Sequence, residues 1–169
     1  DESGLVLYCN SVSKTLAPGY RVGWVAPGKF KDQVMKLKSS HALSSTTITS
    51  EVVADFLKNG RYENHLRKIR QILYNNSLKY SSAIANYFPE NTRVSRPDGG
   101  YFLWVELNKD ISTLDLYERA IKHNVSIAPG RMFSLKQQFD NCLRLGFSLQ
   151  WSDEVEKKIK LLGMLINKS

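Results

Sequence analysis

The fold of this chain is constrained most by residues 11–24, where a lysine and an arginine stand in one short loop between two strand patterns. The apolar run Leu5–Cys9 comes just before this loop and predicts a buried strand. A Pro-Gly dipeptide predicts a turn inside the loop, and Val22–Val25 predicts the second strand. We therefore expect Lys14 and Arg21 near a strand end, where α/β folds collect ligands.

The residue types in this loop suit a phosphorylated aldehyde. A lysine amine forms a Schiff base with a carbonyl, such as the aldehyde of pyridoxal 5'-phosphate, when its surroundings leave it unprotonated often enough to attack. A phosphate group favours a fork-shaped guanidinium together with hydroxyl donors. Lys14 is thus the candidate catalytic residue, and the candidate phosphate-binding residues are Ser11, Ser13 and Arg21.

The full pattern, Ser-x-Ser-Lys-x-x-x-Pro-Gly-x-Arg-x-Gly-Trp, resembles the cofactor-lysine segment of class I/II aminotransferases, the fold-type I pyridoxal phosphate proteins. In that family the lysine carries the cofactor, and the serine three residues before it and the arginine seven residues after it hold the phosphate. The resemblance places these roles on Lys14, Ser11 and Arg21, with Ser13 as a further candidate. It implies an α/β fold, namely the C-terminal portion of such a protein.

Further matches follow in the family's order along the rest of the chain. The segment Pro97–Val105 resembles the family's glycine turn and aromatic strand, and Ile127–Ser134 resembles its Pro-Gly loop facing the substrate. The segment Asn141–Ser148 resembles the strand from which an arginine grips the α-carboxylate of an amino acid. The resemblance therefore implies that Arg144 binds a substrate carboxylate through a paired guanidinium–carboxylate contact.

A narrower resemblance lies in four segments, 7–11, 16–24, 65–70 and 127–134. Their amino-acid sequences are most like those of the aminotransferase-like domain of GntR-family regulators of the MocR type. Those proteins join this domain to a winged helix-turn-helix DNA reader. The resemblance implies an effector domain that senses cofactor or an amino compound, a homodimer, and DNA binding through a domain preceding Asp1. The alternative is a part of a free-standing aminotransferase that acts on an α-amino acid.

Lys14 serves either function, so the residues of the site leave enzyme and sensor both open. In the enzyme, Lys14 is displaced by substrate and then moves the α-proton as a general base. The start at Asp1, without a methionine, predicts a piece of a longer protein with an incomplete site, because the family's ring-binding strands precede the lysine strand. We expect such a piece to bind the cofactor weakly and to be inactive alone.

Two segments are expected along the chain. Residues 1–60 represent the end of the large cofactor-binding domain, and residues 61–169 contain a linking helix and a small α+β domain. Helical spacing predicts helices over 29–40, 52–58 and 62–88. Beyond them the pattern predicts strands over 92–96 and 101–107, a helix over 113–123, strands over 125–128 and 142–147, and a helix over 153–167. Ser112 has the position of a helix cap.

Composition limits the remaining possibilities. The chain has a formal net charge of +8, but its basic clusters fall on the polar faces of predicted helices, so DNA contact is expected mainly from another domain. Neither a membrane-spanning run nor a leader pattern is present, which predicts a cytoplasmic protein without membrane contact. Cys9 and Cys142 are predicted to be buried thiols, and the histidines lack metal-ligand spacing, so no metal is expected.

Overall fold

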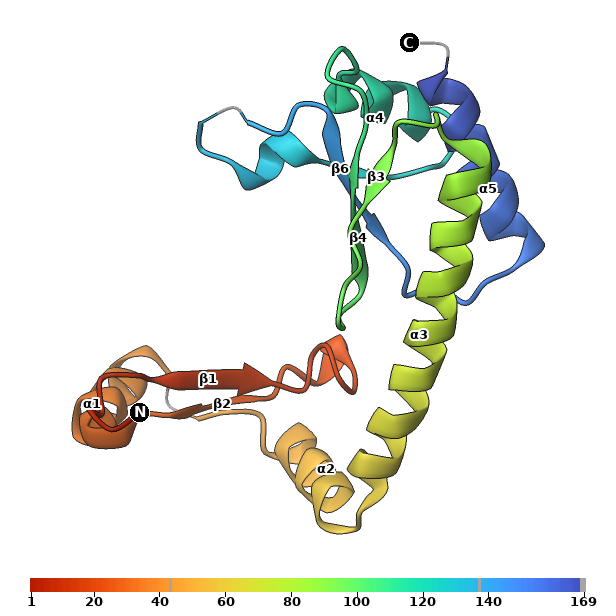
Figure 1. Ribbon diagram of the computed structural model, residues 1–169. Helices are drawn as coiled ribbons and strands as arrows, with labels where there is room; N and C mark the ends of the chain where they lie inside the picture. The colour runs from red at the N-terminus through yellow and green to blue at the C-terminus, as the bar shows by residue number, and fades with distance from the viewer. Residues whose placement is uncertain (43, 137, 168–169) are drawn as a thin grey trace. The chain divides into compact units, whose positions relative to one another are not determined.

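The computed structural model describes residues 1–42, 44–136 and 138–167. The chain divides into two compact units, Asp1–Arg67 and Lys68–Ser169, which we call the first and the second unit. Figure 1 shows the order of the elements along the chain. Among the described residues, no helix has both the length and the apolar character needed to cross a membrane.

The first unit begins with a two-stranded antiparallel ribbon. Strand β1 (Tyr8–Ser11) pairs with β2 (Gly23–Ala26), and the pairing sets Ser11 opposite Gly23. The prediction of a buried strand over Leu5–Cys9 is wrong, because the strand begins at Tyr8 and most of its residues are exposed. No third strand among the described residues pairs with this ribbon, so no neighbouring strand covers its edges.

The same exposure corrects the prediction for one cysteine. Cys9 lies on the exposed ribbon, whereas Cys142 is buried as predicted, and both thiols are free. Burial of an apolar strand depends on the layers packed against its faces, and an apolar run alone does not supply those layers. The sequence pattern therefore identified a strand here without determining its surroundings.

Short helices follow the ribbon. A 3₁₀ turn, Gly28–Phe30, leads into α1 (Lys31–His41), close to the predicted span of 29–40. Helix α2 (Thr47–Lys58) begins earlier than the predicted start at residue 52, because its first turn contains mainly hydroxyl-bearing residues and a single apolar residue, Ile48, and so shows no apolar period. The carbonyl of Thr46 accepts hydrogen bonds from Thr49 Oγ1 and Ser50 Oγ and so stabilises that first turn.

Helix α3 (Arg61–Tyr87) is 27 residues long and agrees with the predicted helix over 62–88. Neither glycine nor proline interrupts it, so the helix continues from the first unit into the second without a sequence-encoded break. Gly60, with a φ of +64°, precedes it in a left-handed conformation that favours glycine. The buried residues of the helix, Asn76, Tyr80, Ala83 and Ile84, all lie in its second half.

The second unit is built on a four-stranded antiparallel sheet with the strand order β3-β4-β6-β5. Its central pair aligns Trp104 with Arg144. The strands are β3 (Arg93–Val94), β4 (Phe102–Glu106), β5 (Ala128–Pro129) and β6 (Cys142–Gly146), each within its predicted span or at its edge. Alternation along β4 and β6 sends one set of side chains into the core and the other set to the opposite face of the sheet.

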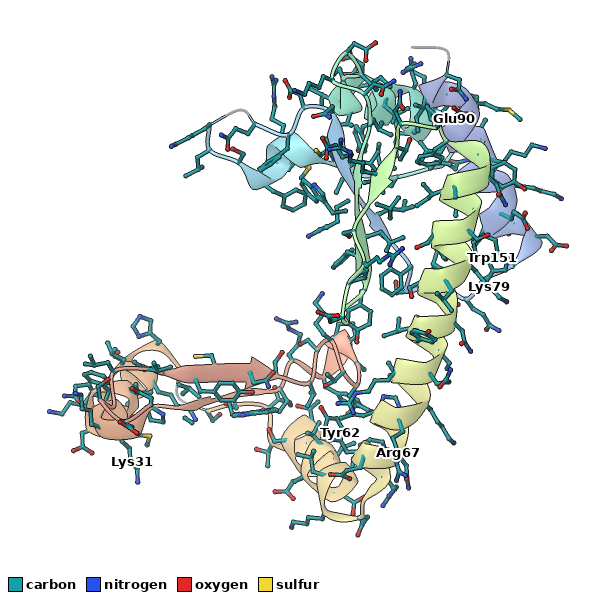
Figure 2. The ribbon with its side chains drawn as sticks, in the orientation of Figure 1. Lys31, Tyr62, Arg67, Lys79, Glu90 and Trp151 are labelled. Atoms are coloured by element: carbon teal, nitrogen blue, oxygen red, sulfur yellow. The ribbon has the colours of Figure 1, made fainter. Side chains whose placement is uncertain are left out.

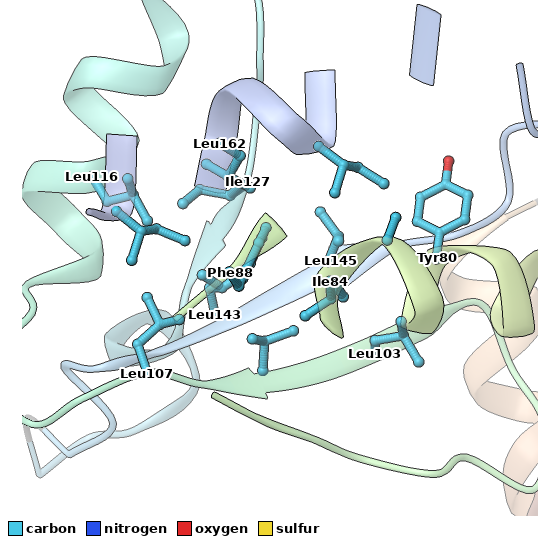
Figure 3. Close-up of a cluster of buried hydrophobic side chains, with 14 of the residues drawn as sticks. Tyr80, Ile84, Phe88, Leu103, Leu107, Leu116, Ile127, Leu143, Leu145 and Leu162 are labelled. Atoms are coloured by element: carbon cyan, nitrogen blue, oxygen red, sulfur yellow. The ribbon is translucent and has the colours of Figure 1, made fainter. Parts of the chain in front are cut away.

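The core of the second unit combines the inward face of this sheet with helices (Figure 3). Helix α4 (Thr113–Ile121) is capped by Ser112, whose side chain accepts from the amide of Asp115, as predicted. Helix α5 (Asp153–Ile166) is capped in the same way by Ser152. Leu103, Val105, Leu143 and Leu145 line the buried face of the sheet beside Leu116 and Leu162.

Candidate functional site

The loop between β1 and β2 is closed by backbone hydrogen bonds around a buried valine. Val12 is fully buried, and its amide donates to Val22 O at 3.1 Å. Its carbonyl accepts from Leu16 N at 2.8 Å and from Ala17 N at 3.2 Å. The backbone between these residues is thereby folded into a tight turn, and Lys14 lies within that turn.

All four residues predicted to hold the cofactor lie at this loop. Lys14 and Arg21 are exposed, whereas Ser11 and Ser13 are half-buried. Arg21 has a φ of +54°, a left-handed conformation that is uncommon for residues other than glycine. Its guanidinium lies 3.5 Å from the carbonyl of Pro18, and no carboxylate within the described residues forms an ion pair with it.

This donor set fits a phosphate group. Two hydroxyls, an ammonium and a guanidinium provide the positive charge and hydrogen-bond donors that a phosphate requires, and among the described residues no carboxylate forms an ion pair with the guanidinium of Arg21. Gly23 allows close strand approach at the same place, because a Cβ there would lie 2.9 Å from the carbonyl of Asn10. The residues present are therefore compatible with the phosphate end of pyridoxal 5'-phosphate.

The loop segment that contains Lys14 is also held by side chains near the start of α3. The phenol of Tyr62 donates to Thr15 Oγ1 at 2.8 Å, and His65 Nε2 lies 2.9 Å from the carbonyl of Thr15. Figure 2 labels Tyr62 at the start of this helix. Neither contact is predictable from the sequence, because nothing in the local pattern links position 15 to residues about fifty positions away.

Arg144 belongs to the second unit and lies on the face of the sheet opposite the core. Its guanidinium carbon is 4.2 Å from the ring centre of Phe102 and 4.5 Å from that of Phe133. Both distances are within the range of cation–π attraction. Among the described residues, none makes a hydrogen bond or ion pair with the Arg144 side chain, so its N–H groups lack a protein acceptor there.

Two more aromatic rings complete this cluster. Trp104 lies edge-to-face with Phe133 at 5.7 Å and with Phe139 at 5.6 Å between ring centres. We call Phe102, Trp104, Phe133 and Phe139 the aromatic cluster. Because aromatic rings cover the flat faces of a guanidinium, they leave its hydrogen-bonding edges for a planar acceptor such as a carboxylate.

The loop that carries Phe133 and Phe139 is held in place at both ends. Arg131 forms a forked ion pair with Asp140, with Nε–Oδ1 at 2.7 Å and Nη2–Oδ2 at 3.0 Å. The carbonyl of Asp140 in turn accepts from Thr113 N at 2.8 Å and Thr113 Oγ1 at 2.7 Å. These bonds explain how a segment without long regular structure presents Phe133 to Arg144 and Phe139 to Trp104.

One titratable group beside this sheet face has an altered acidity. Cys142 aligns with Glu106 across the β4–β6 pair. Burial, with a smaller contribution from the charge of Glu106, raises the pKa of the Cys142 thiol. The thiol therefore remains protonated at neutral pH, and we assign it to packing and not to chemistry.

No family model matches the chain. The chain is 37% identical over 161 residues to the HTH-type transcriptional regulator YdcR of Escherichia coli K12, which covers 95% of this chain and 34% of that protein. It therefore spans about a third of the length of this regulator, and of the next two regulators that it matches.

Solved structures identify the fold. The multiple substrate aminotransferase of Thermococcus profundus matches with a TM-score of 0.89 at 30% identity, over 99% of this chain and 42% of that protein. The kynurenine aminotransferase of Pyrococcus horikoshii, solved in complex with PMP, matches with a TM-score of 0.87 at 30% identity over the same shares. The predicted α/β fold, the C-terminal portion of a fold-type I aminotransferase, is confirmed.

Proposed function

Because this chain has the fold of the C-terminal portion of fold-type I aminotransferases and is homologous to HTH-type transcriptional regulators, we propose that it is part of a regulator's effector domain. The domain binds pyridoxal 5'-phosphate and senses the cofactor or an amino compound. The regulator is of the GntR/MocR type, acts as a homodimer in the cytoplasm, and binds DNA through another domain. Four of the curated relatives that support this proposal carry regulator names.

Within the first unit, each loop residue has a role toward the cofactor. Arg21 would hold the phosphate through its guanidinium, and the half-buried hydroxyls of Ser11 and Ser13 would donate to the remaining phosphate oxygens. Lys14 would provide the amine that holds the aldehyde end of the cofactor and would serve as the proton carrier of the site. When bound, pyridoxal phosphate supplies the electron sink that stabilises negative charge at the ligand's α-carbon.

The single observation that carries the proposal is the state of Arg144. A guanidinium that contacts two rings through cation–π attraction, and has no protein acceptor in the described part of the chain, is prepared to bind an anion from outside the chain. A carboxylate matches the spacing of its donors. The effector is therefore an amino compound that also carries a carboxylate, as an amino acid does.

The test compares amino acids with the amines that lack their carboxylate. In the full-length protein loaded with cofactor, we expect Arg144→Gln to weaken the binding of L-amino acids about 10- to 100-fold, because two charge-assisted hydrogen bonds are lost. Binding of the matching decarboxylated amines should not change. Spectroscopic titration of the bound cofactor with both ligand series gives the ratio of the dissociation constants for amino acids and for amines in each variant.

A matched control replaces an arginine on the same sheet. Arg93 lies on the edge strand β3 and is exposed, so Arg93→Gln should leave both ligand series unaffected. If Arg144→Gln weakened the binding of amino acids and of amines equally, the result would contradict the role of Arg144 in carboxylate binding. Arg144→Lys keeps the charge but lacks the fork, and we expect it to restore only part of the selectivity.

The second candidate function is a free-standing aminotransferase, which the solved structures that match the chain support. Sustained release of keto acid by the full-length protein would favour this enzyme. A winged helix-turn-helix in the chain preceding Asp1, together with no turnover, would favour the regulator. Both functions use Lys14 and Arg144 in the same positions, so the Arg144 test applies to either.

A further inference from the structure

Tyr62 and His65 carry a function that the proposed cofactor site does not yet account for. Both residues lie near the start of α3, three positions apart, so their side chains project from the same face of the helix. Both contact the same residue, Thr15, which follows Lys14 directly in the chain. We propose that this pair, which we call the Thr15 clamp, positions Lys14 for the cofactor.

The two contacts hold different parts of Thr15. Tyr62 donates its phenol proton to the side-chain oxygen at 2.8 Å, which restricts the rotamer of Thr15. His65 Nε2 lies 2.9 Å from the main-chain carbonyl. A carbonyl only accepts hydrogen bonds, so His65 Nε2 carries the hydrogen that this bond requires. Side chain and backbone of Thr15 are thus held by one helix turn.

The clamp residues are themselves held by α2. Phe56 lies edge-to-face with the ring of Tyr62 at 6.4 Å and with the ring of His65 at 5.8 Å between ring centres. Edge-to-face packing of this kind favours a single ring orientation. The donors of the clamp are therefore oriented before any ligand arrives.

The consequence for Lys14 follows from the hydrogen bonds on its other side. Val12, two residues before Lys14, is buried and accepts the amides of Leu16 and Ala17. With the backbone fixed at Val12 and at Thr15, the main chain of Lys14 between them has little freedom. Preorganisation of this kind lowers the entropic cost of ligand binding. This inference rests on the proposed cofactor role of Lys14.

The first measurement needs no cofactor. We expect the double variant Tyr62→Phe with His65→Leu, in the full-length protein freed of cofactor, to exchange the amide hydrogens of residues 12–17 about tenfold faster than the unchanged protein. Both substitutions keep the ring or bulk beside Phe56 and remove only the donors. Hydrogen exchange measured by mass spectrometry reports this loss of local protection.

The second measurement concerns the cofactor itself. The dissociation constant for pyridoxal 5'-phosphate should rise about 5- to 10-fold in the double variant, as expected for the loss of two modest hydrogen bonds. His65→Gln keeps an N–H donor and should restore most of the exchange protection and affinity that His65→Leu loses. The control pair, Tyr74→Phe and His123→Gln, changes the same residue types at exposed positions and should alter neither quantity.

The outcomes separate this inference from the proposed function. Unchanged exchange over residues 12–17, or faster exchange with an unchanged dissociation constant, would overturn the positioning role of Tyr62 and His65. If the unchanged protein bound no pyridoxal phosphate, the proposed function would fall. The exchange data alone would then decide whether the clamp holds the loop.

Discussion

Gly130 shows at the scale of one residue how the site depends on close packing. A Cβ at this position would collide with the carbonyl oxygen of Phe139 and lie 2.7 Å from that of Cys142. Backbone atoms cannot move aside as a flexible side chain can, so only a hydrogen fits here. This close backbone approach at Gly130 fixes the position of the loop that presents Phe133 to Arg144.

We therefore predict that Gly130→Ala lowers the free energy of unfolding by about 1–3 kcal/mol, the usual range for overpacking. Gly99→Ala is the control, because nothing lies within 4 Å of a Cβ at that position. Urea titration of the two variants and the unchanged protein gives the comparison. Midpoints that coincide for all three proteins would show that the loop tolerates a side chain at Gly130.

Helix α3 shows how one element joins distant segments of the second unit. Asn76 is 5% exposed, and its side-chain amide donates to the carbonyls of Phe147 at 3.1 Å and Leu149 at 3.0 Å. These carbonyls follow β6, where the chain leaves the sheet before α5. A polar residue on an otherwise apolar stripe thus satisfies two backbone acceptors, as buried polar groups require.

Replacing Asn76 by Ala should destabilise the protein by about 1–3 kcal/mol, because the carbonyl of buried Phe147 loses the amide donor of Asn76 and that of Leu149 keeps only the long contact from Tyr80 Oη at 3.5 Å. The neighbouring Asn75 is exposed, and Asn75→Ala is expected to have little effect although it changes helix propensity in the same way. Chemical denaturation followed by circular dichroism measures both. An Asn76 variant as stable as the Asn75 variant would argue against this role.

Local pattern was sufficient for the elements that carry their own signals. Apolar spacing predicted α3 and α5, alternation predicted β4 and β6, and a serine at the correct offset predicted the cap of α4. The strand predicted over Leu5–Cys9 was wrongly expected to be buried, because burial is decided by layers that an apolar run does not encode.

The site was predictable only in part for the same reason. The motif around Lys14 and the resemblance around Arg144 named the candidate charged residues. The rings stacked on Arg144 come from β4 and from the 3₁₀ turn Gly130–Phe133, and the clamp on Thr15 comes from α3. Such partners are set by tertiary packing, so periodicity within one segment does not reveal them.

At the scale of the whole molecule, the two units differ in how much apolar surface they bury. The core cluster lies between Tyr80 and Ile166, within the second unit. In the described part of the first unit, Val12 and Val53 are the buried hydrophobic residues. Large apolar side chains at the ribbon remain exposed, namely Leu5, Val6, Leu7, Tyr8, Trp24 and Val25. Fewer buried contacts imply a lower local free energy of opening.

Hydrogen exchange of the 169-residue chain should therefore show faster exchange in β1 and β2 than in β4 and β6. The expected difference is at least about tenfold, because each 1.4 kcal/mol of local opening free energy corresponds to a factor of ten. Repeating the measurement at several protein concentrations controls for association of the exposed ribbon. Equal protection of all four strands would show that the first unit is as stable as the second.

The hydrogen bond between Thr15 and Tyr62 also predicts correlated substitutions among homologues of this protein. A phenol that donates to a hydroxyl loses its acceptor when position 15 becomes alanine or valine, and a phenylalanine at position 62 then costs little. Homologues are expected to change these two positions together, while position 65 retains an N–H donor, because the carbonyl it contacts is present whatever residue occupies position 15.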